Sequence, residues 1–186
     1  ELGNQGAVGL ITYMRTDSTR VAKEAQDEAR EYIQKNYGAS YAPDKVRQVA
    51  RKGAQDAHEA IRPTSVFRNP DEIKGYLSND QYRLYRLIWQ RFMASQMSPA
   101  VFDVVSVDIT AADMVFRATG STVKFQGFMK VYTEGKDDDK VVADEEQPPL
   151  PELKEGEALD LKKLNPEQHF TEPPPRYSEA TLVRAL

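Results

Sequence analysis

The sequence predicts an α+β protein in which a helical region is followed by a mainly antiparallel β region. Two observations lead to this prediction. Up to Pro99 the apolar residues recur every three to four positions, the period of a helix, and after Pro99 they recur every second position, the period of a strand. We therefore expect a helical domain over 1–99, a β-rich domain segment over 100–170, and a connector over 171–186 that ends in a truncated helix.

The helical region begins with a short apolar run. Residues 8–13 are typical of a buried strand, and Asp17 or Ser18 in the polar turn that follows can cap a helix over about 19–36. Gly38 is placed to end this helix. A short helix over 55–61 is expected before Pro63. The apolar face of the first helix is expected to contain Val21, Ala25, Ala29, Tyr32 and Ile33.

Two further helices have clear start signals. Asn69 precedes a proline and two acids, which predicts a short helix that runs to about Leu77. Ser78 and Gln81 have the spacing of a capping box, which predicts a longer helix over about 79–97 that Pro99 ends. The apolar face of the longer helix is expected to contain Tyr82, Tyr85, Ile88, Trp89, Phe92 and Met93.

The β region is predicted from alternation. Residues 101–109, 114–118 and 123–125 alternate between apolar and polar, the run 128–132 is expected to continue the pattern, and 158–164 is predicted as one more strand. The acidic segment 134–151 is interpreted as an exposed loop. Ser178 is expected to open the last helix. Because these strands are few for an independent sheet, we expect the chain to be part of a larger protein.

The composition excludes several classes of protein. The chain of 186 residues contains no cysteine, which excludes disulfides, thiolate metal sites and cysteine nucleophiles. No apolar run is long enough to cross a membrane. The net charge of −4 is unevenly distributed, because 1–99 contain 15 Lys and Arg against 12 Asp and Glu, whereas 100–186 contain 10 against 17. Only the first half therefore offers phosphate groups a favourable surface.

Tyr13 and Arg15 are the first candidate site. A tyrosine at the end of an apolar strand, two residues before an arginine on the same side, has the chemistry of a nucleophile that attacks a phosphodiester. The arginine would neutralise phosphoryl charge and favour the phenolate. On spacing alone, a packed tyrosine beside a solvent-exposed arginine remains the alternative.

His58 and Arg62 are the second candidate site. On a short helix these two residues would share a face and could hold a phosphate or move a proton to a leaving oxygen. A histidine that caps or packs at a helix end is the alternative. Upstream, Lys52 belongs to a basic segment over 45–52 that could contact backbone phosphates or be an ordinary solvated loop.

Four segments in order resemble one family. The chain is similar to the bacterial type IA DNA topoisomerase I family, and Met14 favours this branch over topoisomerase III, where proline usually follows the tyrosine. The segments are Gly9-Leu10-Ile11-Thr12-Tyr13-Met14-Arg15-Thr16-Asp17-Ser18, His58-Glu59-Ala60-Ile61-Arg62-Pro63, Gln96-Met97-Ser98-Pro99-Ala100, and Gln168-His169-Phe170-Thr171-Glu172-Pro173-Pro174 with Tyr177-Ser178-Glu179-Ala180.

The resemblance implies a mechanism and a division of roles. Tyr13 would attack one DNA strand to form a 5′-phosphotyrosyl link, another strand would pass through the gap, and religation would relax negative supercoils without ATP. Arg15 would stabilise the scissile phosphate and His58 would contact DNA near the cleavage site, so these three are the predicted catalytic residues. Arg62, Arg20 and Lys52 are the predicted DNA contacts.

The resemblance also implies what lies outside this chain. In the family, an N-terminal Toprim domain binds Mg²⁺ through acidic residues, and no such motif is present here. The chain would therefore be a piece of a multidomain toroidal enzyme, comprising the tyrosine domain and part of a β-rich arch, and inactive alone. Its partners would be single-stranded or negatively supercoiled DNA and the other domains, and its location the cytoplasm, at the nucleoid. The alternative from a different class is a non-catalytic single-stranded DNA-binding or scaffold module in which Tyr13 is packed.

Overall fold

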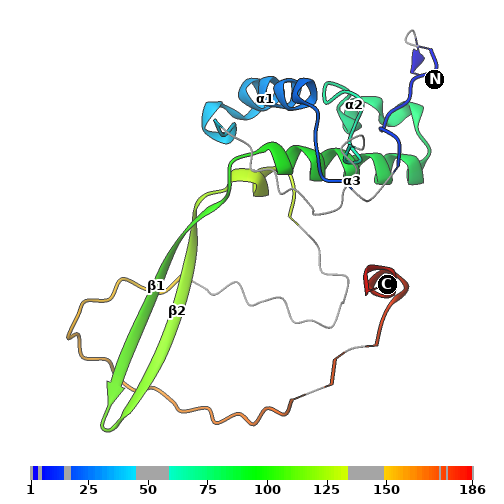
Figure 1. Cartoon of the computed structure of the whole chain (residues 1–186). Helices are drawn as coiled ribbons and strands as arrows, with labels where there is room; N and C mark the ends of the chain where they lie inside the picture. Colours follow the sequence, from blue (N-terminus) through cyan, green and yellow to red (C-terminus); the bar gives the residue numbers. More distant parts are fainter. Residues whose placement is uncertain are drawn as a thin grey trace. The chain divides into compact units, whose positions relative to one another are not determined.

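The computed structural model describes residues 2–3, 6–14, 18–44, 59–133, 149–171, 173–174 and 176–185. The chain divides into two compact units, Glu1–Pro151 and Glu152–Leu186, which we describe separately. Helices precede a two-stranded antiparallel sheet in the first unit, and a short helix lies near the end of the second (Figure 1). The predicted α+β class is confirmed, while the domain boundaries at 99/100 and 170/171 remain predictions.

Helix α1 spans Lys23–Tyr37 and begins later than the sequence indicates. The reason is that Arg20 is held in a non-helical segment, where its carbonyl oxygen accepts a hydrogen bond from the Ala60 N–H at 2.7 Å. Ser18 therefore does not cap the helix, and its hydroxyl accepts from the Arg20 N–H at 3.2 Å instead. At the other end Gly38 has φ of +101°, a conformation that glycine adopts readily, and it ends α1 as predicted.

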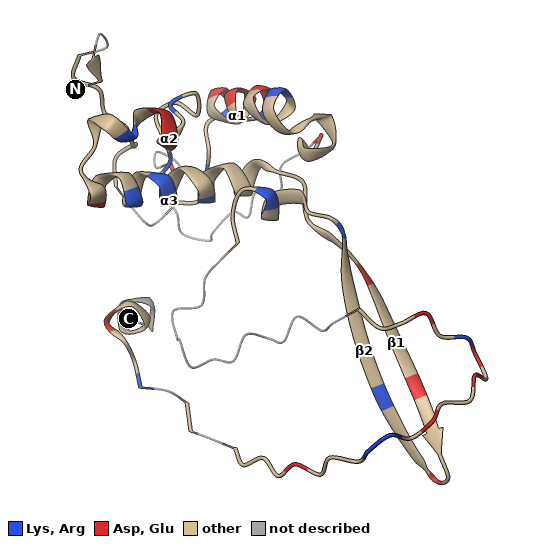
Figure 2. Cartoon of the chain, turned by 180° about the vertical axis from the view of Figure 1, so that it is seen from behind, with Lys and Arg blue, Asp and Glu red and all other residues tan. Residues whose placement is uncertain are grey.

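Helix α3 spans Asn79–Gln96 and lies beside α1 in both views (Figures 1 and 2). Its predicted capping box is present, since Ser78 and Gln81 each accept a hydrogen bond from the other's backbone N–H. The preceding turn contains α2, Pro70–Ile73, and a 3₁₀ helix, η3, Lys74–Tyr76. The predicted cap is also confirmed there, because the Asn69 side chain accepts from the Asp71 N–H at 2.9 Å.

The core lies where α1, α3 and the segment around Val66 meet. Trp89 packs edge-on against Tyr32 with their ring centroids 5.6 Å apart, and its indole N–H donates to the Val66 carbonyl at 3.0 Å. Burying aromatic and aliphatic side chains stabilises such a core by about 1.5–3 kcal/mol each. Nine residues of the two predicted apolar faces are buried: Val21, Ala25, Ala29, Tyr32, Ile33, Tyr85, Trp89, Phe92 and Met93. The other two, Tyr82 and Ile88, are only partly buried.

Strands β1, Val101–Ala111, and β2, Met114–Phe125, pair antiparallel as a hairpin. Asp108 and Arg117 face each other across it, with Arg117 Nε 2.7 Å from an Asp108 carboxylate oxygen. Their hydrogen bond lowers the pKa of Asp108. Large apolar side chains on both faces of the hairpin are exposed, Val104 and Phe116 among them.

A short 3₁₀ helix, η4, Gly127–Lys130, joins the hairpin to the helices. Here the prediction that 128–132 continues the alternating strand is wrong, because Gly127 turns the chain with φ of +50° and the Phe128 N–H donates to the Ser98 carbonyl at 2.9 Å. The Tyr41 and Phe125 rings lie 4.7 Å apart between their centroids. These contacts attach the base of the hairpin to the residues after α3 and to the 3₁₀ helix η2, Ala39–Tyr41, which follows α1.

The second unit contains α4, Glu179–Ala185. Ser178 opens this helix as expected, since its hydroxyl accepts from the Thr181 N–H at 3.3 Å and its own N–H donates to the Thr181 hydroxyl at 2.8 Å. The predicted strand over 158–164 is wrong, because these residues are exposed and pair with no strand among the described residues. Alternation alone does not make a strand when no partner supplies the ladder hydrogen bonds.

Candidate functional site

The residues before Tyr13 pair with the segment that follows Ala60. Ile11 forms a single antiparallel bridge with Pro63, and the Thr12 N–H donates to the Arg62 carbonyl at 2.9 Å. The predicted strand over 8–13 is therefore reduced to one bridge at a partly exposed position. The predicted helix over 55–61 is likewise wrong for its described part, because residues 59–61 are not helical. Residues 55–58 lie outside the described residues.

Thr12 holds the two segments together through its side chain. Its hydroxyl oxygen accepts from the Arg62 N–H at 3.0 Å and lies 3.2 Å from the Ala60 carbonyl oxygen, to which it donates. Thr12 was not among the predicted site residues. The signal available was a hydroxyl residue next to the candidate nucleophile, but its partner is 48 to 50 residues away in the chain.

Ala60 is tied to the chain on both sides of Tyr13. Its carbonyl accepts from the Thr12 hydroxyl, and its N–H donates to the Arg20 carbonyl at 2.7 Å. The chain therefore contacts Ala60 at Thr12, before Tyr13, and again at Arg20, after Tyr13. Tyr13 is the first residue of the loop that is closed between these two anchors.

Tyr13 itself points into solvent. Its side chain is 83% exposed, and among the described residues its hydroxyl has no hydrogen-bond partner. This exposure argues against a tyrosine packed in a core. A phenol with an anchored backbone and a free hydroxyl can meet a group supplied from outside the chain.

The predicted partners of Tyr13 are only partly described. Arg15, His58 and Lys52 lie outside the described residues, so their distances from Tyr13 stay predictions. Arg20 is exposed, and its backbone is held beside Ala60.

The guanidinium of Arg62 is already bonded to neighbouring residues of its own segment. Its guanidinium lies 3.0 Å from a Glu59 carboxylate oxygen and donates to the Pro63 carbonyl at 3.1 Å, while its Nε is buried without a partner. Its side chain is 14% exposed. A phosphate group that bound Arg62 would have to compete with Glu59.

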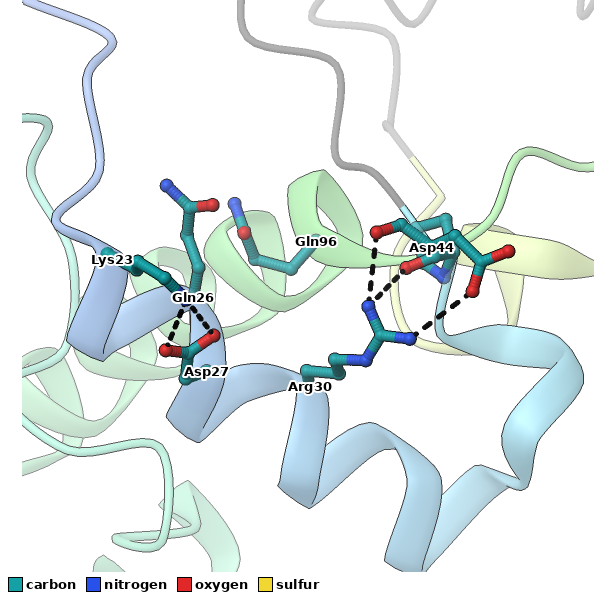
Figure 3. Close-up of a pocket in the computed structure, with 7 residues that line it drawn as sticks. Lys23, Gln26, Asp27, Arg30, Asp44 and Gln96 are labelled. Atoms are coloured by element: carbon teal, nitrogen blue, oxygen red, sulfur yellow. Dashed lines mark hydrogen bonds and ion pairs between the residues drawn. The ribbon is translucent and has the colours of Figure 1, made fainter.

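A separate polar pocket of about 380 Å³ lies between α1 and the end of α3 (Figure 3). Two ion pairs line it, Lys23 with Asp27 at 2.8 Å and Arg30 with Asp44 at 3.4 Å. The side-chain oxygen of buried Gln96 has no partner there. Since each cation in the lining has its own carboxylate, the pocket offers no net charge to a ligand.

The described residues hold no group of three His, Asp or Glu placed to bind a metal ion. None of the helices in the described part of the chain is long and apolar enough to cross a membrane.

Comparison with known proteins shows the family of this chain. Residues 5–186 match the family described as DNA topoisomerase. The chain belongs to the DNA topoisomerase family. It is also similar to the structure of full-length topoisomerase I from Thermotoga maritima, with a TM-score of 0.75 and 36% sequence identity over 97% of this chain. The resemblance found in the sequence is thereby confirmed at the level of the family.

The matched region is one part of the longer protein. This chain spans 28% of the Thermotoga chain. The tyrosine-bearing loop, the α3 core and the hairpin belong to that part, while the activity and substrates of the whole enzyme remain proposals for this family member.

Proposed function

We propose that this chain carries the nucleophile of a type IA DNA topoisomerase, with Tyr13 as the residue that attacks DNA. The proposal is supported mainly by the combination of an 83% exposed tyrosine and two bonds to Ala60, one from the Thr12 hydroxyl before Tyr13 and one to the Arg20 carbonyl after it. An anchored position removes part of the entropic cost of bringing a nucleophile to its target. Membership of the DNA topoisomerase family gives this tyrosine its substrate class.

In the proposed step the Tyr13 oxygen attacks the phosphorus of a phosphodiester in a single strand. A phosphotyrosyl bond to the 5′ phosphate forms, the bond from phosphorus to the 3′ oxygen breaks, and the phenolic proton ends on the 3′ hydroxyl. One phosphodiester is exchanged for another, so religation is the reverse step and needs no ATP. The intact enzyme would pass a second strand through the gap and relax negative supercoils.

The other predicted residues keep the roles that the resemblance implies. Arg15 would stabilise the negative charge that develops on the phosphate, and His58 would contact DNA near the cleavage site. Arg20, Lys52 and Arg62 would contact the backbone of the strand. We expect the Mg²⁺ requirement to be met by acidic residues of a domain outside this chain, and the enzyme to act in the cytoplasm on nucleoid DNA.

The test is the trapping of a covalent adduct. The chain is mixed with the N-terminal part of a topoisomerase I and with a 3′-labelled single-stranded oligonucleotide, because the fragment that becomes linked to the protein through its 5′ phosphate keeps the 3′ end, and the products are separated under denaturing conditions. Wild-type chain should form a protein–DNA adduct, and Tyr13→Phe should form none. Tyr76→Phe is the matched control, because Tyr76 is also exposed and lies outside the anchored loop. An adduct that survives in Tyr13→Phe would overturn the assignment of the nucleophile.

A further inference from the structure

Residues 59–62 hold the tyrosine-bearing segment although they belong to no helix or strand. Ala60 donates its N–H to the Arg20 carbonyl at 2.7 Å and accepts from the Thr12 hydroxyl at 3.2 Å. Arg62 donates its N–H to the Thr12 hydroxyl at 3.0 Å and accepts from the Thr12 N–H at 2.9 Å. All four bonds depend on how the backbone of 59–62 is turned, and no helix or sheet ladder fixes that backbone.

A side-chain ion pair closes this short segment. The Arg62 guanidinium lies 3.0 Å from a Glu59 carboxylate oxygen, so the pair spans the two residues between them. The other terminal nitrogen of Arg62 donates to the Pro63 carbonyl at 3.1 Å. Among the described residues, no second carboxylate lies within ion-pair distance of Arg62. The pair therefore bridges the backbone groups that hold Thr12.

The pair of Glu59 and Arg62 is shielded from water. Their side chains are 28% and 14% exposed, and the Arg62 Nε is buried without a partner. By contrast, both side chains of the Lys23–Asp27 pair on α1 are mostly exposed. An exposed pair contributes little to stability because water competes for both charges, whereas removal of one partner of a shielded pair leaves the other charge uncompensated. The conformation of 59–62 thus depends on Glu59.

We propose that Glu59 is a positioning residue for the nucleophile, because through Arg62 it holds the segment to which the Tyr13 loop is attached. That the held residue is a nucleophile rests on the proposed function. In this role Glu59 needs no contact with DNA. Its effect reaches Tyr13 through Thr12, whose backbone and hydroxyl both bond to Arg62. A nucleophile that is held in place loses less entropy when it reacts.

The first test is amide hydrogen exchange of the chain without DNA, resolved by residue with NMR. Glu59→Gln keeps the size of the side chain and removes its charge. We expect the Thr12 and Ala60 amides to exchange about tenfold faster, because both donate to carbonyls across the pairing and their local opening becomes about 1.4 kcal/mol easier. The amide of Trp89 in α3 should exchange at the wild-type rate.

Two further variants isolate the ion pair. Arg62→Gln should accelerate the same amides, and the double variant with Glu59→Gln should add little to either single one, because all three lose one interaction. Asp27→Asn is the matched control, since it breaks the exposed pair with Lys23 at 2.8 Å and should leave the exchange at Thr12 unchanged.

The second test uses the Tyr13 adduct, formed with the N-terminal part of a topoisomerase I. In Glu59→Gln the initial rate of adduct formation at saturating oligonucleotide should fall, while the oligonucleotide concentration at half-saturation should not rise. A residue that contacted DNA would instead raise that concentration. Glu59→Asp keeps the charge and should restore part of the rate.

Three results would overturn the inference. The first is wild-type exchange at Thr12 and Ala60 in Glu59→Gln, and the second is an equal acceleration at Trp89, which would indicate a general loss of stability. The third is a raised half-saturation with an unchanged saturating rate, which would assign Glu59 to binding instead. If wild type forms the adduct and Glu59→Gln exchanges like wild type, only this inference fails. If exchange accelerates and wild type forms no adduct, the proposed function fails and the hold of Glu59 on the segment stands.

Discussion

Thr12 is the residue whose replacement tests the architecture of the site most directly. Thr12→Val keeps the shape of the side chain and replaces the hydroxyl with a methyl group. The Arg62 N–H then loses its acceptor at 3.0 Å, and the Ala60 carbonyl loses a donor at 3.2 Å. The loop that carries Tyr13 would keep its backbone bonds to Arg62 and Ala60 but lose the side-chain link between them.

The expected cost follows from these two bonds. A polar group left without a partner costs about 1–3 kcal/mol when it is buried. Thr12 is only partly buried, so water can satisfy part of the loss, and we expect the free energy of unfolding to fall by about 1–2 kcal/mol. For a chain of this size the melting temperature would decrease by about 2–8 °C. The yield of Tyr13 adduct should fall as well, because the anchor of the loop is weakened.

The measurement is urea denaturation of the wild-type chain and of two further variants. Thr12→Ser keeps the hydroxyl and should retain most of the stability and the adduct yield. Thr64→Val removes an exposed hydroxyl that donates to the Gly9 carbonyl at 2.7 Å, and its cost should be below about 0.5 kcal/mol because water can replace it. The reasoning is refuted if Thr12→Val is as stable as wild type, or if Thr12→Ser is as damaging as Thr12→Val.

Three further predictions concern the scaffold. Gly127→Ala should be strongly destabilising in a thermal melt, because the residue has φ of +50° and a Cβ would lie 2.4 Å from the Pro99 carbonyl; a melting temperature equal to wild type would contradict this. Gln96→Met should raise the free energy of unfolding by up to about 1 kcal/mol, because it removes the unpartnered buried oxygen, and a decrease would contradict this. Burial raises the pKa of Tyr85 to about 12 from an unfolded value of 10, so its contribution to stability is complete below pH 10 and is lost as the pH rises toward 12. Urea titrations over this range should show a smaller decline in Tyr85→Phe than in wild type, and equal declines would assign the loss to other tyrosines.

Periodicity predicted the parts of the fold that are stabilised locally. The capping box of Ser78 and Gln81 and the apolar positions of α3 lie within one segment, so the sequence contains both the start signal and the buried face. Alternation also predicted β1, but it indicated two separate runs over 114–118 and 123–125, which the structure joins in the single strand β2. In each of these elements the partners are neighbours in the sequence.

The errors arose where distant residues decide the structure. The start of α1 is delayed because the Arg20 carbonyl is bonded to Ala60, 40 residues away in the chain. The residues after Gln126 turn away from the strand because Phe128 bonds to Ser98. Neither contact leaves a pattern in its own segment, since any residue can supply a backbone donor or acceptor. For the same reason the sequence indicated Tyr13 as a candidate but not the role of Thr12 in holding its loop.

The anchoring of the loop and the exposure of Tyr13 both suit a nucleophile that acts on a polymer. A nucleophile that acts on a polymer from outside the chain must be reachable, and a fully exposed side chain on a free loop would lose entropy when it reacts. Ala60 is bonded to the Thr12 side chain before Tyr13 and to the Arg20 carbonyl after it, while the Tyr13 hydroxyl stays free of partners among the described residues. The segment that leads into Tyr13 is thus held by folding, before DNA arrives. A tyrosine whose role was to pack would need the opposite arrangement, with its ring buried and its hydroxyl satisfied by the protein, as Tyr85 has with the Arg68 carbonyl at 2.7 Å.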